Sequence, residues 1–199
     1  MRVALRGLML ATVFVAACGT TPASRLYTLG ADASESDRVA QETRRIEIVA
    51  VRIPDLWDRP QLVLTKSANE VNFSEFHRWA SPLKAEIPRV VVRNLSRVLD
   101  DPTIWLREDF AGARPDMRVQ VTIDRMEASA GDSVQLDAAW AIRAAEGDFV
   151  ARVGRVSIVE KTADASHDAV VSATRRALLA LSVAVAKDIA AVPKGAGGK

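Results

Sequence analysis

Two short motifs place a serine where an enzyme could use it as a nucleophile. Ser81-Pro82-Leu83-Lys84 has the S-x-x-K spacing, which on a helix sets a lysine amine one turn from a serine hydroxyl. The S-D-N and K-T-G motifs that accompany it in serine acyl-enzymes are absent from the sequence. The second motif, Gly-Asp-Ser-Val at 131–134, falls between two predicted strands, where a Gly-Asp turn explains it. We therefore predict no catalytic residues and no enzymatic activity.

The sequence also gives no support for a metal site or for a nucleotide-binding loop. His77 and His167 are the only histidines, they lie far apart in the sequence, and neither has carboxylates at metal-ligand spacing. We expect each histidine in the first turn of a helix and predict no metal site. No glycine-rich phosphate loop is present, which argues against an ATPase.

The only cysteine, Cys18, follows the most apolar run of the chain. Arg2 and Arg6 precede this run, which extends from Leu8 to Ala17 and is about half of the roughly 20 residues that a membrane-spanning helix needs. Val15-Ala16-Ala17-Cys18 fits the bacterial lipobox. We predict a signal peptide over 1–17, cleavage between Ala17 and Cys18, and lipid attachment at Cys18.

The lipobox implies a covalent diacylglycerol and an N-acyl chain on Cys18, and we expect no other cofactor. An ordinary secretory signal with an incidental cysteine is the alternative. Gly19 stands where aspartate would retain a lipoprotein in the inner membrane. We therefore expect a lipid anchor in the outer membrane, with the protein facing the periplasm.

Charge and size narrow the class of the exported protein. The chain has 27 basic and 25 acidic residues, and loss of Arg2 and Arg6 leaves 25 of each. This balance gives no support for nucleic-acid binding, and one cysteine allows no internal disulfide. About 180 residues remain, which suits one domain with a core of its own.

The remaining sequence divides into a tether, a domain and a tail. We expect a tether over 18–43 with an edge strand at 25–29, a domain over 44–192, and a disordered tail over 193–199. Within the domain, 44–54 predicts a central strand, with Ile46, Ile48 and Ala50 on one face and Val49 and Val51 on the other. A hairpin turn is expected at 67–69.

The next segment changes to helical periodicity. Apolar residues recur every three or four positions from Phe76 to Val98, so we predict a helix that Ser74 caps. Pro82 and Pro88 should interrupt it, which predicts a short helix, a break and a longer helix.

The last part predicts a meander and a final helix. A short strand lies within 100–109, and long alternating runs follow at 117–129, 132–145 and 147–163. Ser166 can cap the helix over 167–192. The fold class is therefore α/β: one domain with a mixed, largely antiparallel sheet and two main amphipathic helices.

The residues also carry a family resemblance. The stretch Pro54–Val63 reads P-D-x-x-D-R-P-Q-[LIV]-V, Arg78–Leu83 reads R-W-A-x-P-L, and a lipobox precedes both. The chain thus resembles the ABC-type transport auxiliary lipoproteins, the paraquat-inducible protein C group. The resemblance implies an accessory to a lipid-transport system whose bridging component carries mammalian-cell-entry (MCE) domains. It also implies a fold similar to the amino-terminal domain of the Tol-Pal propeller protein, and no catalytic residues.

Since we predict no catalytic residues, we expect the functional regions of the protein to be binding surfaces. The predicted partner-binding residues are Trp57, Asp58, Arg59 and Gln61, because an exposed Trp beside an Arg in a loop is typical of a binding hot spot. The alternative is that Trp57 caps the core, as we expect of Trp79.

We expect this lipoprotein to dock the MCE-domain protein at the outer membrane and to support envelope integrity. The sequence leaves open whether it forms a homo-oligomer. The other function considered is a periplasmic lipoprotein that itself holds a lipid, with the apolar face of the meander lining a groove for an acyl chain.

Overall fold

The structure of the protein is a computed structural model that describes residues 22–31, 34–110, 112–144 and 149–193. Within these ranges the chain forms eight strands, two α-helices and two short 3-10 helices. The strands are β1 (Arg25–Tyr27), β2 (Ile46–Arg52), β3 (Gln61–Ser67), β4 (Glu70–Trp79), β5 (Ile104–Leu106), β6 (Met117–Ser129), β7 (Ser133–Ala144) and β8 (Val150–Lys161). The helices are η2 (Glu35–Asp37), η3 (Asp55–Trp57), α2 (Leu83–Val98) and α3 (His167–Ala191).

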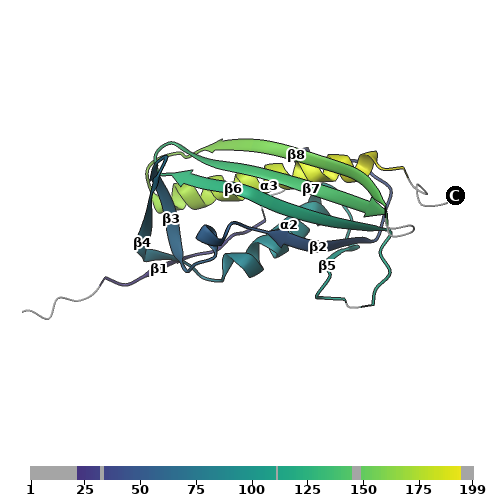
Figure 1. The fold of residues 1–199 in the computed structure, drawn as a ribbon, viewed down its shortest axis with the longest axis horizontal. Helices are drawn as coiled ribbons and strands as arrows, with labels where there is room; N and C mark the ends of the chain where they lie inside the picture. Colours follow the sequence, from purple (N-terminus) through teal and green to yellow (C-terminus); the bar gives the residue numbers. More distant parts are fainter. Residues whose placement is uncertain (1–21, 32–33, 111, 145–148, 194–199) are drawn as a thin grey trace, which may run out of the picture.

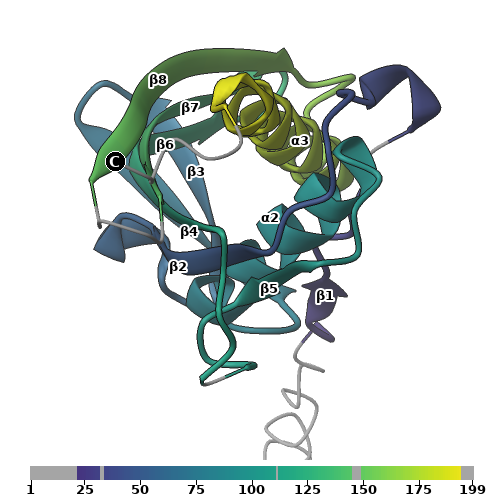
Figure 2. The ribbon, with the colours of Figure 1, turned by 90° about the vertical axis from the view of Figure 1, so that its right-hand side faces the viewer.

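The strands form two mixed sheets in place of the single sheet that we expected. The smaller has the order β1-β4-β3 and the larger β5-β2-β6-β7-β8 (Figure 1). β2 is parallel to both β5 and β6, while β6, β7 and β8 form the predicted antiparallel meander. The end-on view in Figure 2 shows both α-helices on the inner side of the curved larger sheet. The predicted α/β class is confirmed, and the Tol-Pal comparison stays a prediction.

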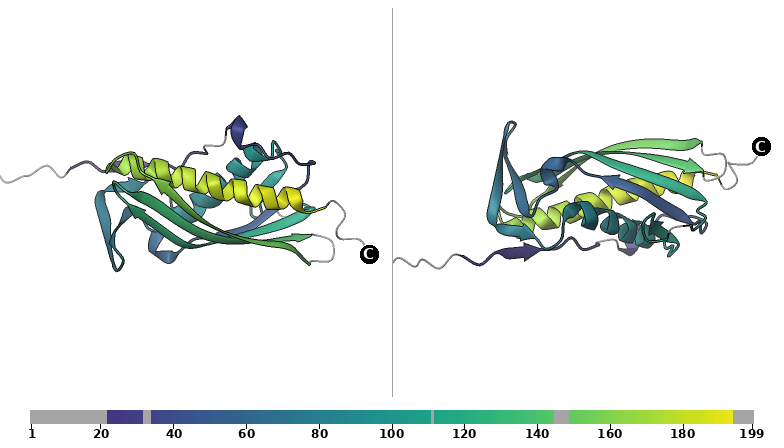
Figure 3. Two further views of the ribbon diagram at one scale, coloured as in Figure 1. Left: turned by 90° about the horizontal axis from the view of Figure 1, so that it is seen from above. Right: turned by 60° about the horizontal axis from the view of Figure 1, so that its bottom comes forward.

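Helix α3 forms the long axis of the core. It begins where Ser166 caps it, the serine Oγ accepting a hydrogen bond from the Ala169 amide at 3.1 Å, as predicted. It runs along β6–β8 for most of their length (Figure 3), with Leu178, Leu181 and Val185 fully buried. By length and composition it could span a membrane, but 61% of its most apolar stretch is buried against the fold. It is therefore placed as a core helix.

Two β-bulges change which side chains face the core. The pairing of β2 with β6 shifts between Ile48 and Ala50, and Val51 is then buried together with Ile46 and Ile48. The predicted division of this strand, with Ala50 on the Ile46 face and Val51 on the other, was wrong because one inserted residue reverses the alternation. A second shift, between Ile123 and Arg125, has the same effect in β6.

The helix predicted from Ser74 starts later than expected. Residues 70–79 form β4, which pairs with β3 and β1, and α2 begins at Leu83, directly after Pro82. α2 then passes Pro88 without the predicted break. Burial of the flanking Ile87 offsets the cost of the missing amide donor. Ser74 caps no helix.

The expected tether contributes to the domain. β1 pairs in parallel with β4, which confirms the predicted edge strand. Leu29 is 2% exposed and lies in the core, and the Arg97 guanidinium donates to the Ala31 carbonyl at 2.9 Å. Packing therefore begins near residue 25, well before the predicted boundary at 44. Of the predicted tail, residues 194–199 lie outside the described ranges.

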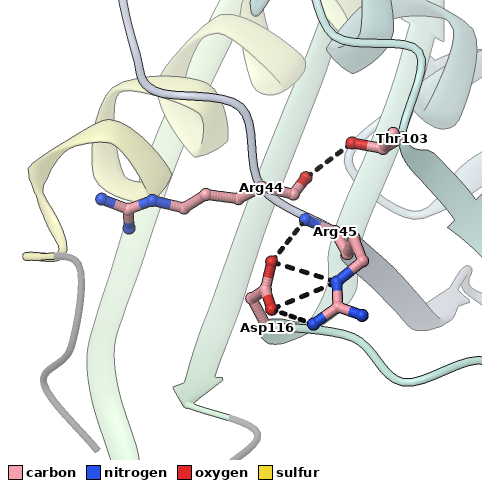
Figure 4. A network of polar contacts seen from close by, with 4 residues as sticks. All are labelled: Arg44, Arg45, Thr103 and Asp116. Carbon is pink, nitrogen blue, oxygen red and sulfur yellow. Dashed lines mark hydrogen bonds and ion pairs between the residues drawn. The ribbon is translucent and has the colours of Figure 1, made fainter.

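A polar network fixes the start of β2 (Figure 4). The Thr103 hydroxyl donates to the Arg44 carbonyl at 2.9 Å, and the Arg45 guanidinium pairs with Asp116 at 2.6 Å. The Arg44 guanidinium donates to the Val192 carbonyl at 2.6 Å, at the end of α3. The network thus joins the entry of β2 to the segments that precede β5 and β6 and to the final helix.

Candidate functional site

The loop predicted to bind a partner is ordered around a buried tryptophan. Trp57, at the end of η3, is 2% exposed and belongs to the hydrophobic core. Its expected exposure was wrong, and the alternative, that it caps the core, is confirmed. The apolar surface of its indole ring is buried inside the domain and is not accessible to a partner.

The other predicted residues surround this anchor at the surface. Asp58 is exposed, while Arg59 and Gln61 are half-buried. The Arg59 guanidinium donates to the Leu56 carbonyl at 2.9 Å and lies 4.1 Å from the centroid of the Phe73 ring. Leu56 of this loop and Phe73 of β4 are 40% and 37% exposed, so both present apolar surface to solvent. Neither residue was among the predicted partner-binding residues, and Phe73 comes from a separate element, β4.

A groove opens beside the loop. It has a volume of about 950 Å³, with β2 as its floor, and Asp55 and Asp58 lie on its rim. The first half of α2 forms one wall through Pro82, Lys84, Ala85 and Pro88, and the end of β5 forms the other through Leu106, Arg107 and Glu108. Of the residues predicted to bind a partner, the structure places only Asp58 in this groove.

The floor of the groove is an open strand edge. β5 pairs with β2 only from Ile46 to Ile48, and the Arg107 amide makes the last bond, to the Ile48 carbonyl at 3.1 Å. β2 continues to Arg52, and in the described part of the chain no strand pairs with that side beyond Ile48. Such an edge can accept an extended segment through main-chain hydrogen bonds.

The α2 wall has an unusual backbone at the same place. Pro88 lacks an amide proton and cannot donate to the Lys84 carbonyl as a helical residue would. Both residues line the groove. The groove therefore combines the open edge of β2 with a helical wall that lacks one main-chain hydrogen bond.

The two histidines meet although 90 residues separate them. His77 lies on β4, not in a helix as expected, and His167 is the first residue of α3, as predicted. Their rings stack with centroids 3.6 Å apart and planes 5° from parallel. His77 Nδ1 is 2.8 Å from the Tyr27 hydroxyl, and His167 Nε2 is 2.9 Å from the Ser74 hydroxyl.

This histidine pair is better suited to holding β1 than to chemistry. Burial, the neighbouring His77 and the charge of Arg25 together lower the pKa of His167, which favours the neutral form of its ring. Ser74 is 7% exposed, which closes its hydroxyl to a substrate. Among the described side chains, no group of three or more His, Cys, Asp or Glu residues is placed to hold a metal ion.

The two serine motifs take up ordinary structural positions. Ser81 precedes the Pro82 cap of α2, so Ser81 and Lys84 do not share a helical turn. Gly131, with φ of +76°, forms the turn between β6 and β7, as its Gly-Asp sequence predicted. Cys18 and the Ala17–Cys18 cleavage site lie outside the described residues and stay predictions.

Comparison with known proteins agrees with this fold. Residues 27–186 match the family described as ABC-type transport auxiliary lipoprotein component. Among curated proteins, none matches the chain significantly.

Two solved structures share the architecture. One is a crystal structure of a protein from Xanthomonas campestris, with a TM-score of 0.71 and 12% identity, covering 84% of this chain and 95% of that one. The other is a crystal structure of an uncharacterised protein, with a TM-score of 0.66 and 18% identity, covering 84% of this chain and 99% of that one. At these identities the likeness concerns the fold alone.

Proposed function

Since the chain belongs to the family of ABC-type transport auxiliary lipoprotein components, we propose that it docks the periplasm-spanning MCE-domain protein of a lipid-transport system at the outer membrane. In this proposal Cys18 carries the lipid anchor and the folded domain supplies the docking surface. The role is that of an accessory subunit, with no reaction of its own.

One observation carries the proposal: the groove along the open edge of β2. A carrier needs an enclosed apolar space that removes most of a lipid from water, whereas a docking subunit needs an accessible surface. This groove runs beside an unpaired strand edge and is lined by both charged and apolar residues, including Lys84, Glu108 and Leu106. It suits a segment of protein better than an acyl chain.

The test is direct binding between purified components. The mature chain with Cys18→Ser, which cannot be lipidated, should bind the periplasmic part of the MCE-domain protein in surface plasmon resonance. Ala85→Arg fills the groove from an exposed position on α2 and should weaken binding by about tenfold or more. Ala113→Arg adds the same side chain at an exposed site that does not line this groove and should leave binding unchanged.

Both variants should melt at the same temperature as the parent, because neither replaces a core residue. Equal binding by Ala85→Arg and Ala113→Arg would remove the groove from the proposal. Absence of binding in the parent, together with lipid retained through purification and detected by mass spectrometry, would favour the carrier function instead.

A further inference from the structure

The edge of the larger sheet that lies opposite the groove is formed by β8. This strand is the last in the order β5-β2-β6-β7-β8, and in the described part of the chain no strand pairs with its free side (Figure 1). β8 has 12 residues, and its pairing with β7 is regular from Arg152 to Lys161. Along this stretch, the main-chain groups that point away from β7 can pair with a further strand. A long, regular and open edge is a template for pairing with another chain.

Apolar side chains are exposed along this edge. Val153 and Val159 are 69% and 56% exposed, and Val153 is the most exposed large apolar residue among those that the structure describes. They lie on the same face of β8, because their positions differ by an even number of residues. Charged residues, proline or a bulge usually protect such an edge, and between the two valines the only charged residue is Arg155. The middle of the edge is therefore weakly protected against pairing.

Two ion pairs join β8 to α3. The Arg176 guanidinium pairs with Glu160 at 3.0 Å near the end of β8, and Asp188 pairs with Arg152 near its start. Since the two pairs lie toward opposite ends of β8, the side of α3 between Arg176 and Asp188 follows the open edge.

The side of α3 between these ion pairs has small apolar residues. Ala180 and Ala184 are four residues from each other and from Arg176 and Asp188, so all four positions lie in one row on the helix. Both alanines are half-buried within the fold and thus keep some contact with solvent. Small side chains in such a row let a second helix approach to about 8 Å between axes.

The sequence of β8 is complementary to itself. If two copies of β8 pair antiparallel about a two-fold axis at Val156, each residue lies opposite the one equally far on the other side of Val156. Val153 of one copy then lies opposite Val159 of the other, and Arg152 lies opposite Glu160. Apolar residues thus meet apolar residues, and opposite charges meet at both ends.

Helix α3 fits the same axis. Val156 is midway between the two β8 residues that form the ion pairs, so the axis passes beside the middle of the α3 row, between Ala180 and Ala184. Ala180 of one copy then faces Ala184 of the other, and Arg176 faces Asp188. The strand and the helix therefore agree on one two-fold arrangement, as a symmetric interface requires.

We propose that β8 pairs with β8 of a second copy of this chain, so that the two larger sheets join into one continuous sheet across a two-fold axis at Val156. The groove beside β2 lies at the opposite edge of the sheet, so this pairing leaves it open. The inference does not depend on the proposed docking function.

Sedimentation velocity of the mature chain with Cys18→Ser tests the pairing. The soluble protein should sediment as a dimer at micromolar concentrations. Adding Val153→Lys/Val159→Lys sets like charges opposite each other and should raise the dissociation constant of the dimer about ten- to a hundredfold. Both valines are exposed, so the melting temperature should stay that of the parent.

Val153→Lys/Val159→Glu is the matched control. It replaces the same two valines, but in the proposed register it sets opposite charges against each other, so this variant should dimerise like the parent. Equal weakening in both variants would overturn the register. A parent that stays monomeric up to about 100 μM would overturn the pairing. So would an assembly of any size that Val153→Lys/Val159→Lys leaves intact.

Disulfide cross-linking tests the position of the axis. Cys18 is the only cysteine, so Cys18→Ser/Val156→Cys gives each copy one thiol, directly opposite its counterpart. Opposite Cα atoms in an antiparallel pair are about 4.5–5.5 Å apart, within reach of a disulfide, so mild oxidation should give a covalent dimer.

Cys18→Ser/Val153→Cys is the control for this cross-link. Its thiol is more exposed than one at Val156 but lies about 20 Å from its counterpart in this register, so it should not cross-link. Equal cross-linking of the two variants, or none in Cys18→Ser/Val156→Cys, would overturn the proposal.

Discussion

Replacing Trp57 should make the domain easier to unfold, although the residue lies in a surface loop. The indole is 2% exposed and packs in the core from the short η3 helix. Burying a tryptophan removes about 200 Å² from water, which at about 25 cal/mol per Å² corresponds to roughly 5 kcal/mol. Truncations of buried tryptophan typically cost about 3–5 kcal/mol, so Trp57→Ala should lower the free energy of unfolding by that amount.

Thermal melting followed by circular dichroism measures this effect. For a domain of this size each kcal/mol shifts the melting temperature by about 2–4 °C, so Trp57→Ala should melt roughly 6–20 °C below the parent. Leu56→Ala is the matched control, because Leu56 belongs to the same turn and is 40% exposed. It should cost less than about 1 kcal/mol. A Trp57→Ala protein that melts within about 2 °C of the parent would refute the assignment of Trp57 to the core.

Three further predictions concern β8, the histidine pair and the anchor. Gly154→Ala places a methyl group 2.3 Å from the Trp140 ring, so it should destabilise the domain by about 1–3 kcal/mol in urea titrations, and an unchanged midpoint would contradict that packing. Burial, His77 and Arg25 hold the pKa of His167 below its ordinary value, so the unfolded chain takes up the proton first and stability should fall as the pH drops below about 6.5. The fall should be smaller in His167→Gln, and an equal fall in both proteins would assign it to other groups. Cys18→Ala should release the protein from membranes, since each buried acyl CH₂ contributes about 0.8 kcal/mol, and a variant that stays in the membrane fraction after a salt wash would contradict lipidation.

The parts of the fold that the sequence predicted well have long, regular patterns. The strands of the meander β6–β8 are 12 or 13 residues long, and β7 alternates from Val134 to Ala144. Helix α3 combines the Ser166 cap with a continuous apolar stripe. In such segments local preference and tertiary packing favour the same structure, so the sequence alone is sufficient.

The errors occurred where two patterns fit the same residues. Phe76, Trp79 and Leu83 have helical spacing, yet the first two lie on β4, because pairing with β3 and β1 decides the conformation there. In β2, Val49 and Val51 are both apolar, so nothing in their types marks the inserted residue of the bulge.

The candidate sites could be predicted least. The sequence placed Asp58 and Arg59 correctly in a loop but could not show that Trp57 turns inward. The histidine pair joins residues from β4 and α3, and periodicity within one element carries no information about contacts between separate elements.

The parallel pairing of β1 with β4 has a mechanical consequence for an anchored protein. From Cys18 to Arg25 the chain can reach at most about 25 Å, so lipidation at Cys18 would hold β1 close to the bilayer. A force that pulls the domain away from the membrane would then act on β1 along the axis of this strand. Because β1 lies alongside His77–Trp79 of β4, this force shears the three paired positions together and does not open them one after another. Force applied by a bridging partner would therefore be resisted collectively where the tether joins the domain.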